Sequence, residues 1–280
     1  MSALASLAKL FGFDLVQFRR ACRGLLPYLA NKKVFDAQHR ASKERAFQAG
    51  KLYPCLTDRF DEMGVASGHY FHQDLLAARL IYQANPIRHI DVGSRIDGFV
   101  AHVAAFREIE VFDIRRLSTD AKGITFRQVD IMQSNDELAE CTDSLSCLHV
   151  LEHFGLGRYG DPIDYEGHRK GFRNLVRMLK PGGRLYFSVP IAKVQRFEFD
   201  AHRVFSIPYL LAMFRENDLL LDSFSYVDDA GALHVGIDPH LVEEMKESLE
   251  LHFGCGIFEL RKPAWNSVRD TPVEARRISA

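Results

Sequence analysis

The segment from Ile90 to Phe99, with the sequence IDVGSRIDGF, constrains the fold more than any other stretch of the chain. It begins as an apolar strand, turns at Gly93 and continues into a helical pattern over residues 99–106. Gly93 permits a sharp backbone turn, and Gly98 permits close approach between the helix and a strand or a ligand. A strand, a glycine turn and a helix in this order are typical of nucleotide sites in doubly wound α/β domains. A purely structural turn also uses such a glycine.

The residues after this turn alternate between strand and helix patterns. Seven strands are expected, at residues 88–92, 108–113, 124–129, 144–149, 184–190, 220–227 and 256–260. Helices are expected at 98–106, through Phe172 and Leu179, and before the stop at Asn85-Pro86. A hairpin-like turn at 228–231 and a charged helix at about 239–251 separate the last two strands. The sequence therefore predicts an α/β fold with a doubly wound, seven-stranded, mostly parallel sheet of the Rossmann-like type.

An acidic residue marks the expected end of the second strand. Asp113 lies 22 positions after Asp91. An acid at this distance from the glycine turn is placed to accept hydrogen bonds from two ribose hydroxyls. The alternative is an exposed carboxylate at a strand end that binds nothing. The joint spacing with Gly93 and Gly98 favours the ribose role.

Composition excludes several classes of protein. The formal net charge of −1 gives no reason to expect a nucleic acid partner. The five cysteines are scattered and lack C-x-x-C spacing, so reduced thiols are expected and no metal site is predicted. The start of the chain lacks a signal-peptide pattern, and no stretch approaches the roughly 20 apolar residues of a membrane span. We therefore expect a cytoplasmic protein.

The chain is predicted to contain three regions. They are an N-terminal helical and loop extension at 1–70, an α/β domain at 71–262 and a polar tail at 263–280. Asp14 is placed to cap a helix in the first region. Residues 1–45 hold nine Lys and Arg against three acids. A basic helix of this kind is compatible with peripheral contact to an anionic membrane, and also with packing on the domain or on the second subunit of a homodimer.

These motifs together resemble those of class I S-adenosylmethionine-dependent methyltransferases, over residues 72–262. The resemblance rests on the turn DVGSRIDG at 91–98, Asp113, Asp130 after the third strand, HVLEH at 149–153 and LKPGGRL at 179–185. More narrowly, the chain is similar to DUF268, a bacterial and nematode family of undefined function. That likeness rests on the turn at 93–98, AHRVF at 201–205 and GCGIF at 254–258, and is expected over nearly the whole chain.

The resemblance implies a set of cofactor contacts. Residues expected to surround the methionine part of S-adenosylmethionine are Asp91, Gly93, Ser94 and Gly98. Asp113 is expected at the ribose, Asp130 and Ile131 at the adenine, and His149 on the cavity floor near the sulfonium. One position departs from the family pattern, because Arg95 stands where a glycine is usual. A cation there either crowds the sulfonium or pairs with the cofactor carboxylate or with Asp97.

Methyl transfer to a hydroxyl requires a general base near the methyl group. Two histidines are candidates for this catalytic role, His153 and His202, because an imidazole titrates near neutral pH. For His153 the alternative is a structural role in shaping the cofactor floor. The glycine-rich loop at 154–162, which contains Arg158 and Tyr159, is long enough to contact an acceptor. His149 and His153 are four residues apart, but no third ligand has suitable spacing for a metal.

The favoured interpretation is an enzyme, a methyltransferase that uses S-adenosylmethionine to methylate a small-molecule or carbohydrate-type hydroxyl. Glycan acceptors are suggested by the family association alone. The main alternative is a binding or regulatory module that keeps the methyltransferase fold without turnover, which Arg95 favours. A nicotinamide-dependent oxidoreductase shares the strand, glycine and acid pattern. The LEH and KPGG stretches, together with the incomplete glycine triplet, argue against that third class.

Overall fold

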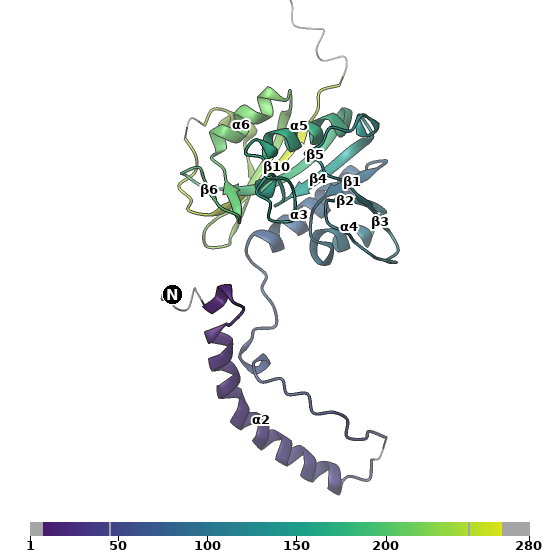
Figure 1. The fold of residues 1–280 in the computed structure, drawn as a ribbon, viewed down its shortest axis with the longest axis vertical. Helices are drawn as coiled ribbons and strands as arrows, with labels where there is room; N and C mark the ends of the chain where they lie inside the picture. The colour runs from purple at the N-terminus through teal and green to yellow at the C-terminus, as the bar shows by residue number, and fades with distance from the viewer. Residues whose placement is uncertain (1–7, 45, 246, 265–280) are drawn as a thin grey trace, which may run out of the picture. The chain divides into compact units, whose positions relative to one another are not determined.

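Residues 1–65 and residues 66–280 form two separate units in the computed structural model, which describes residues 8–44, 46–245 and 247–264 (Figure 1). The polar tail predicted at 263–280 lies outside the described residues from position 265 onward. No helix among the described residues is long and apolar enough to cross a membrane.

The first unit is built on one long helix, α2 (Leu15–Ala41). The predicted cap is present, because the carboxylate of Asp14 accepts hydrogen bonds from the backbone N–H groups of Val16 and Gln17 at 2.8 and 3.1 Å. A short 3₁₀ turn, η1 (Asp58–Phe60), follows later in the unit. The segment just before η1 packs closely on α2, since a Cβ at Gly24 would lie 1.8 Å from the carbonyl oxygen of Leu56.

The second unit contains an eight-stranded sheet in the order β3-β2-β1-β4-β5-β10-β8-β9. Its strands are β1 (His89–Val92), β2 (Ile109–Asp113), β3 (Ile124–Gln128), β4 (Thr142–Leu148), β5 (Leu179–Ile191), β8 (Leu220–Val227), β9 (Leu233–Ile237) and β10 (Gly254–Arg261). Strands β3, β2, β1, β4 and β5 pair in parallel, while β10 runs antiparallel to β5 and β8. The predicted doubly wound α/β fold is confirmed. The eighth strand, β9, was not predicted and forms a hairpin with β8 across the expected turn.

Helices cover both faces of this sheet (Figure 1). Helices α3 (His69–Ala84) and α4 (Ala101–Ala104), with the π-helical turn η2 (Ile96–Val100), bury apolar side chains against one face. Helices α5 (Gly167–Met178) and α6 (Ile207–Glu216) bury the larger core on the other. Smaller elements complete the unit: η3 (Asp136–Leu138), η4 (Leu151–His153), α7 (Pro239–Glu243) and the separate hairpin of β6 (Arg196–Glu198) and β7 (His202–Val204).

Two predicted helices differ from the structure. The helix expected at 98–106 begins as the irregular turn η2, because Gly98 has non-helical backbone angles. The charged helix expected at 239–251 is limited to α7. After α7 the chain carries Leu249 and Leu251 onto the main core, and the carbonyl of Leu251 accepts a hydrogen bond from the backbone of Lys193 at 2.8 Å. Tertiary packing of this segment therefore overrides its helical sequence pattern.

Candidate functional site

A cavity of about 330 Å³ opens at the carboxyl ends of the parallel strands. The last residues of three strands line it: Val92 of β1, Phe112 and Asp113 of β2, and Leu148 of β4. The other lining residues are Tyr70, Gly93, Arg95, Ile114, Arg115, Val129 to Met132, His149, Val150, His153, Phe154, Arg158, Tyr159 and Asp161. Strand order reverses between β1 and β4. Ligands of open α/β sheets bind at such a switch point, so this cavity is the candidate site.

Gly93 forms the edge of the cavity at the end of β1. Its φ of 72° lies in the left-handed region, and an added Cβ would lie 2.6 Å from Cγ1 of Val150. Its N–H donates to the carbonyl of Phe112 at 2.9 Å, which ties the turn to β2. Only glycine satisfies both the backbone angle and the close approach.

Asp91 and Ser94 are buried behind this turn and do not line the cavity. The Asp91 carboxylate accepts hydrogen bonds from the N–H of Ser94 at 3.0 Å, its hydroxyl at 2.7 Å and the hydroxyl of Ser146 at 2.6 Å. Burial raises the pKa of Asp91 to about 6. Gly98 also lies outside the lining, where an added Cβ would be 2.7 Å from Oδ2 of Asp74. Asp91, Ser94 and Gly98, which were predicted to contact the cofactor, thus shape the turn and do not line the cavity.

Asp113 does line the cavity, but its carboxylate already has a partner. Arg115 donates to it through the backbone N–H at 2.8 Å, Nε at 3.0 Å and Nη2 at 2.5 Å. The Arg115 guanidinium also lies 4.4 Å from the ring centre of Tyr159. A ribose that binds Asp113 must therefore share the carboxylate with Arg115 or displace it. Sequence reasoning did not single out Arg115, although its place two residues after the acid was a usable signal.

Asp130 and Ile131 lie together where β3 leads into the next turn, and both line the cavity. Oδ1 of Asp130 accepts a hydrogen bond from the N–H of Met132 at 2.9 Å. The carbonyl of Ile131 accepts one from the side-chain amide of Asn174 at 2.8 Å. These bonds fix the segment that the resemblance assigns to the adenine.

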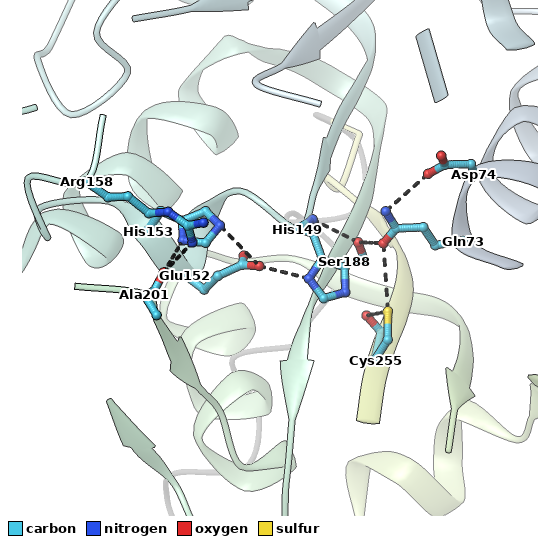
Figure 2. Close-up of polar contacts among 10 residues, drawn as sticks. Gln73, Asp74, His149, Glu152, His153, Arg158, Ser188, Ala201 and Cys255 are labelled. Carbon is cyan, nitrogen blue, oxygen red and sulfur yellow. Dashed lines mark hydrogen bonds and ion pairs between the residues drawn. The ribbon is translucent and has the colours of Figure 1, made fainter. Parts of the chain in front are cut away.

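The floor of the cavity is formed by the segment after β4. His149 has a left-handed φ of 55°, and its Nδ1 lies 2.9 Å from Oε1 of the buried Glu152. Figure 2 shows His149 between Glu152 on one side and Ser188, Gln73 and Cys255 on the other. The N–H of His149 donates to the hydroxyl of Ser188 at 3.1 Å.

The two predicted general bases are not brought together. His153 lines the cavity, and its Nδ1 donates to the carbonyl of Ala201 at 2.7 Å, which leaves the lone pair on Nε2 (Figure 2). Burial lowers the pKa of His153, so the ring is neutral at pH 7. His202 is outside the lining, on β7, where Nε2 lies 3.3 Å from Oε2 of Glu198. Of the two, only His153 therefore lines the cavity, and its Nε2 lies 3.9 Å from Oε1 of the buried Glu152.

The glycine-rich loop predicted to meet the acceptor does reach the cavity. Tyr159 lies beside the guanidinium groups of Arg115 and Arg158, at 4.4 and 5.3 Å from its ring centre. Asp161 accepts hydrogen bonds from the N–H groups of Gly155 and Gly157 at 2.9 and 3.2 Å, which closes the loop on itself. Tyr70, from the start of α3, also lines the cavity.

Arg95 is exposed at the cavity edge. Its guanidinium donates to Asp97 at 3.1 and 2.8 Å and lies 5.7 Å from the ring centre of Tyr70. Of the alternatives open for this residue, the structure shows the pair with Asp97. The two charges thus offset each other at the entrance.

Residues 107–235 match the model of a family described as "Caenorhabditis protein of unknown function, DUF268". This stretch resembles DUF268. The predicted resemblance is confirmed, but over less than half of the chain. The matched range includes the AHRVF segment at 201–205 and leaves out the glycine turn at 93–98 and the GCGIF segment at 254–258. No curated protein shows significant sequence similarity to the chain.

Three solved structures illustrate the likeness of fold. The 1,6-didemethyltoxoflavin-N1-methyltransferase of Burkholderia thailandensis, crystallised with its acceptor and S-adenosylhomocysteine, is 13% identical, with a TM-score of 0.47 over 68% of this chain and 78% of that one. The N-methyltransferase NodS of Bradyrhizobium japonicum, also with S-adenosylhomocysteine, is 16% identical, with 0.45 over 74% and 92%. The [4+2]-cyclase SpnF is 16% identical, with 0.46 over 67% and 81%. A shared fold does not by itself assign a function, so the function has to follow from the cavity.

Proposed function

We propose that this protein is an S-adenosylmethionine-dependent methyltransferase that methylates a hydroxyl of a small-molecule or carbohydrate-type acceptor. The observation that supports this most is the cavity at the switch point, which joins Gly93 after β1, Asp113 of β2 and Asp130 after β3. Three successive strands thus offer a tight turn and two carboxylates to one elongated ligand. This arrangement suits a ligand with a polar tail, a diol and an exocyclic amine, and S-adenosylmethionine has all three groups.

The donors and acceptors of the cavity fit the cofactor part by part. Asp113 offers a carboxylate to the ribose hydroxyls, and Asp130 offers one to the adenine amine. Arg95 supplies a cation at the edge of the cavity for the methionine carboxylate, in exchange for part of its bond with Asp97. When bound, the cofactor supplies an electrophilic methyl group on a good leaving group. Positioning then accounts for much of the rate, because acceptor and methyl must lie in line.

His153 is proposed as the base that takes the proton from the acceptor hydroxyl. Its Nδ1–H is held by the carbonyl of Ala201, so the Nε2 lone pair is the basic site. A neutral imidazole at pH 7 is the form that a general base requires. Tyr159 and Arg158 of the glycine-rich loop offer a stacking face and a cation to an acceptor with hydroxyl groups. These features favour a sugar-like acceptor.

Ligand binding to the purified protein tests the cofactor part. Thermal unfolding is measured with S-adenosylmethionine, S-adenosylhomocysteine or NAD. A ligand at about 100 times its dissociation constant adds about 2.7 kcal/mol to stability, so the two adenosyl ligands should raise the midpoint clearly and NAD should not. Asp113→Ala should abolish this rise, while Asp120→Ala, at an exposed position outside the cavity lining, should keep it. A rise with NAD alone would instead indicate the oxidoreductase class.

A second measurement separates the enzyme from the binding module. Transfer of an isotope-labelled methyl group is followed over a panel of sugars and small alcohols, with His153→Gln as the variant. The proposal expects labelled product from the wild type, and a loss of turnover in the variant with cofactor binding retained. Cofactor binding without labelled product on any acceptor would favour the module that keeps the fold without turnover.

We also propose that the protein acts in the cytoplasm and contacts anionic membrane surfaces through α2. This helix presents apolar side chains to solvent, including Leu26 and Phe35 at 76% and 69% exposure, among its lysines and arginines. Basic and apolar groups on one helix are what an anionic lipid surface attracts. Pairing of two chains through α2, as in a homodimer, is the alternative outcome.

A further inference from the structure

Three potential metal ligands converge beside the cavity floor. They are His69, the first residue of α3, His149, which follows β4, and Cys255, the second residue of β10. One ligand atom from each lies within 4.8 Å of the others. The residues are far apart in the sequence, so the fold itself assembles the cluster. Sequence patterns such as C-x-x-C or closely spaced histidines detect only ligands that are near one another in the chain. The sequence therefore does not predict this cluster.

His149 is oriented as a ligand with one nitrogen unused. Its Nδ1 lies 2.9 Å from the carboxylate of Glu152, which is itself buried. Its Nε2 is buried and has no hydrogen-bond partner among the described residues. A metal-binding histidine characteristically gives its other ring N–H to a carboxylate, which fixes the ring and its tautomer. A buried imidazole nitrogen without a partner is costly unless something binds it.

Cys255 and His69 complete the cluster. The Cys255 side chain is fully buried (Figure 2). Its sulfur lies 3.8 Å from Oε1 of Gln73 and 3.8 Å from the carbonyl oxygen of Gly256, and the His149 imidazole is a further polar neighbour. The ring of His69 stacks on that of His149 with 5.3 Å between ring centres and an interplanar angle of 23°. The His69 ring also stacks on that of Phe253, with 5.4 Å between ring centres. The two stacked rings are thus held in place next to the sulfur.

We propose that His69, His149 and Cys255 bind one transition-metal ion, with Zn²⁺ as the occupant. Imidazole nitrogen and thiolate sulfur are the ligands that zinc prefers, at about 2.0 to 2.3 Å. Around a tetrahedral ion such atoms lie roughly 3.3 to 3.7 Å apart, so each pair of ligand atoms has to approach by about 1.5 Å at most on binding. Three protein ligands leave a fourth position for water or a ligand group. This site goes beyond the proposed methyl transfer, which does not require it.

The same residues also resemble a nucleophile, a base and an orienting acid, in the order Cys255, His149 and Glu152. That arrangement requires the sulfur to reach a substrate. Cys255 is fully buried and is absent from the lining of the cavity, so a substrate in the cavity does not meet it. A single metal ion is small enough to enter beside the half-buried His69. The observations therefore favour a metal over a covalent intermediate.

Metal binding is tested on the full-length protein after treatment with a chelator. Titration with Zn²⁺ should give one bound equivalent. Titration with Co²⁺ should give one equivalent with a thiolate-to-cobalt charge-transfer band in the near ultraviolet. Cys255→Ser should remove that band and weaken binding at least 100-fold, and Glu152→Gln should weaken it about 10- to 100-fold through the orientation of His149. Cys147→Ser, at another fully buried cysteine, should leave both readouts unchanged.

The proposal is overturned if the wild type binds neither ion in stoichiometric amount, or if Cys255→Ser keeps the wild-type affinity and spectrum. If Cys255→Ser does not fold, His69→Asn provides an independent test at a half-buried position. That variant should also lose the bound ion. Neither His69 nor Cys255 lines the cavity, so both variants should keep the thermal shift with S-adenosylhomocysteine. If the wild type binds the metal but shows no thermal shift with S-adenosylhomocysteine, the result contradicts the proposed methyltransferase function and leaves the metal site standing.

Discussion

His89 and Asp91 share one hydroxyl group beneath the glycine turn. The Ser146 hydroxyl donates its proton to Asp91 at 2.6 Å. Nε2 of His89 lies 3.2 Å from the same hydroxyl oxygen, so it must be the donor of that second hydrogen bond. Nδ1 of His89 then accepts from the hydroxyl of Ser144 at 2.8 Å. The ring is therefore neutral, with its proton on Nε2. Because His89 is fully buried, desolvation lowers its pKa to about 3.

The pKa of His89 predicts acid sensitivity of the fold. The unfolded chain binds a proton at this ring below about pH 6.5, whereas the folded chain does so only near pH 3. Stability is therefore fully present above pH 6.5 and falls by roughly 1.4 kcal/mol for each unit between these values. In His89→Leu the ring cannot titrate. Denaturant unfolding from pH 7 to 4 should show the stability difference between wild type and variant shrinking, and a constant difference would contradict the assignment.

At the scale of elements, the loop between η4 and α5 is held by one buried arginine. Arg203, 7% exposed, donates through Nη1 to the carbonyl of Phe154 at 2.6 Å and through Nη2 to that of Tyr165 at 3.1 Å. It comes from β7, so the small hairpin fixes both ends of the loop that carries Tyr159 into the cavity. The planar fork of arginine suits two carbonyls at once.

Arg203→Lys should loosen this loop. A lysine keeps the charge but not the fork, so at least one buried carbonyl loses its partner at a cost of about 1–3 kcal/mol. Denaturant unfolding should show that loss, and limited proteolysis should cut within residues 155–165 sooner than in the wild type. Arg158→Lys is the matched control, because Arg158 is more exposed and makes a single carbonyl contact, so its stability should stay within about 0.5 kcal/mol of the wild type.

Elements were predictable where local pattern and packing agree. Strand β8 begins and ends at the predicted residues 220 and 227, because a regular strand pattern is bounded by clear turns. Strand β9 was missed because only its pairing with β8 makes it a strand. In the site, Gly93 and Asp113 reach the cavity as expected, since both lie at strand ends. Asp91 does not, because its carboxylate accepts a hydrogen bond from Ser146 of a neighbouring strand. His202 does not, because it lies on the small β6–β7 hairpin opposite Glu198.

At the scale of the whole molecule, the buried core belongs to the second unit. Among the described residues of the first unit only Gly24 is buried, while every buried apolar side chain lies beyond residue 76. The first unit therefore adds little apolar burial to the stability of the sheet.

A chain that begins at Ala66 should accordingly unfold within about 0.5 kcal/mol of the full-length protein. The same pair of chains tests the proposed role of α2. The full-length protein should sediment with vesicles rich in anionic lipid and be released by salt, and the shortened chain should stay in solution. Equal sedimentation of both chains would contradict membrane contact through α2. Dimers of the full-length protein alone would assign the helix to subunit pairing.

The position of β10 has a consequence for the order of synthesis. Among the described residues it is the last strand in chain order, yet it lies between β5 and β8 in the finished sheet. Until residue 261 has emerged, the 13 residues of β5 present an open edge, and the β8–β9 hairpin has no strand to join. Open apolar edges invite pairing with other chains. The nascent protein is thus most exposed to aggregation just before β10 is inserted.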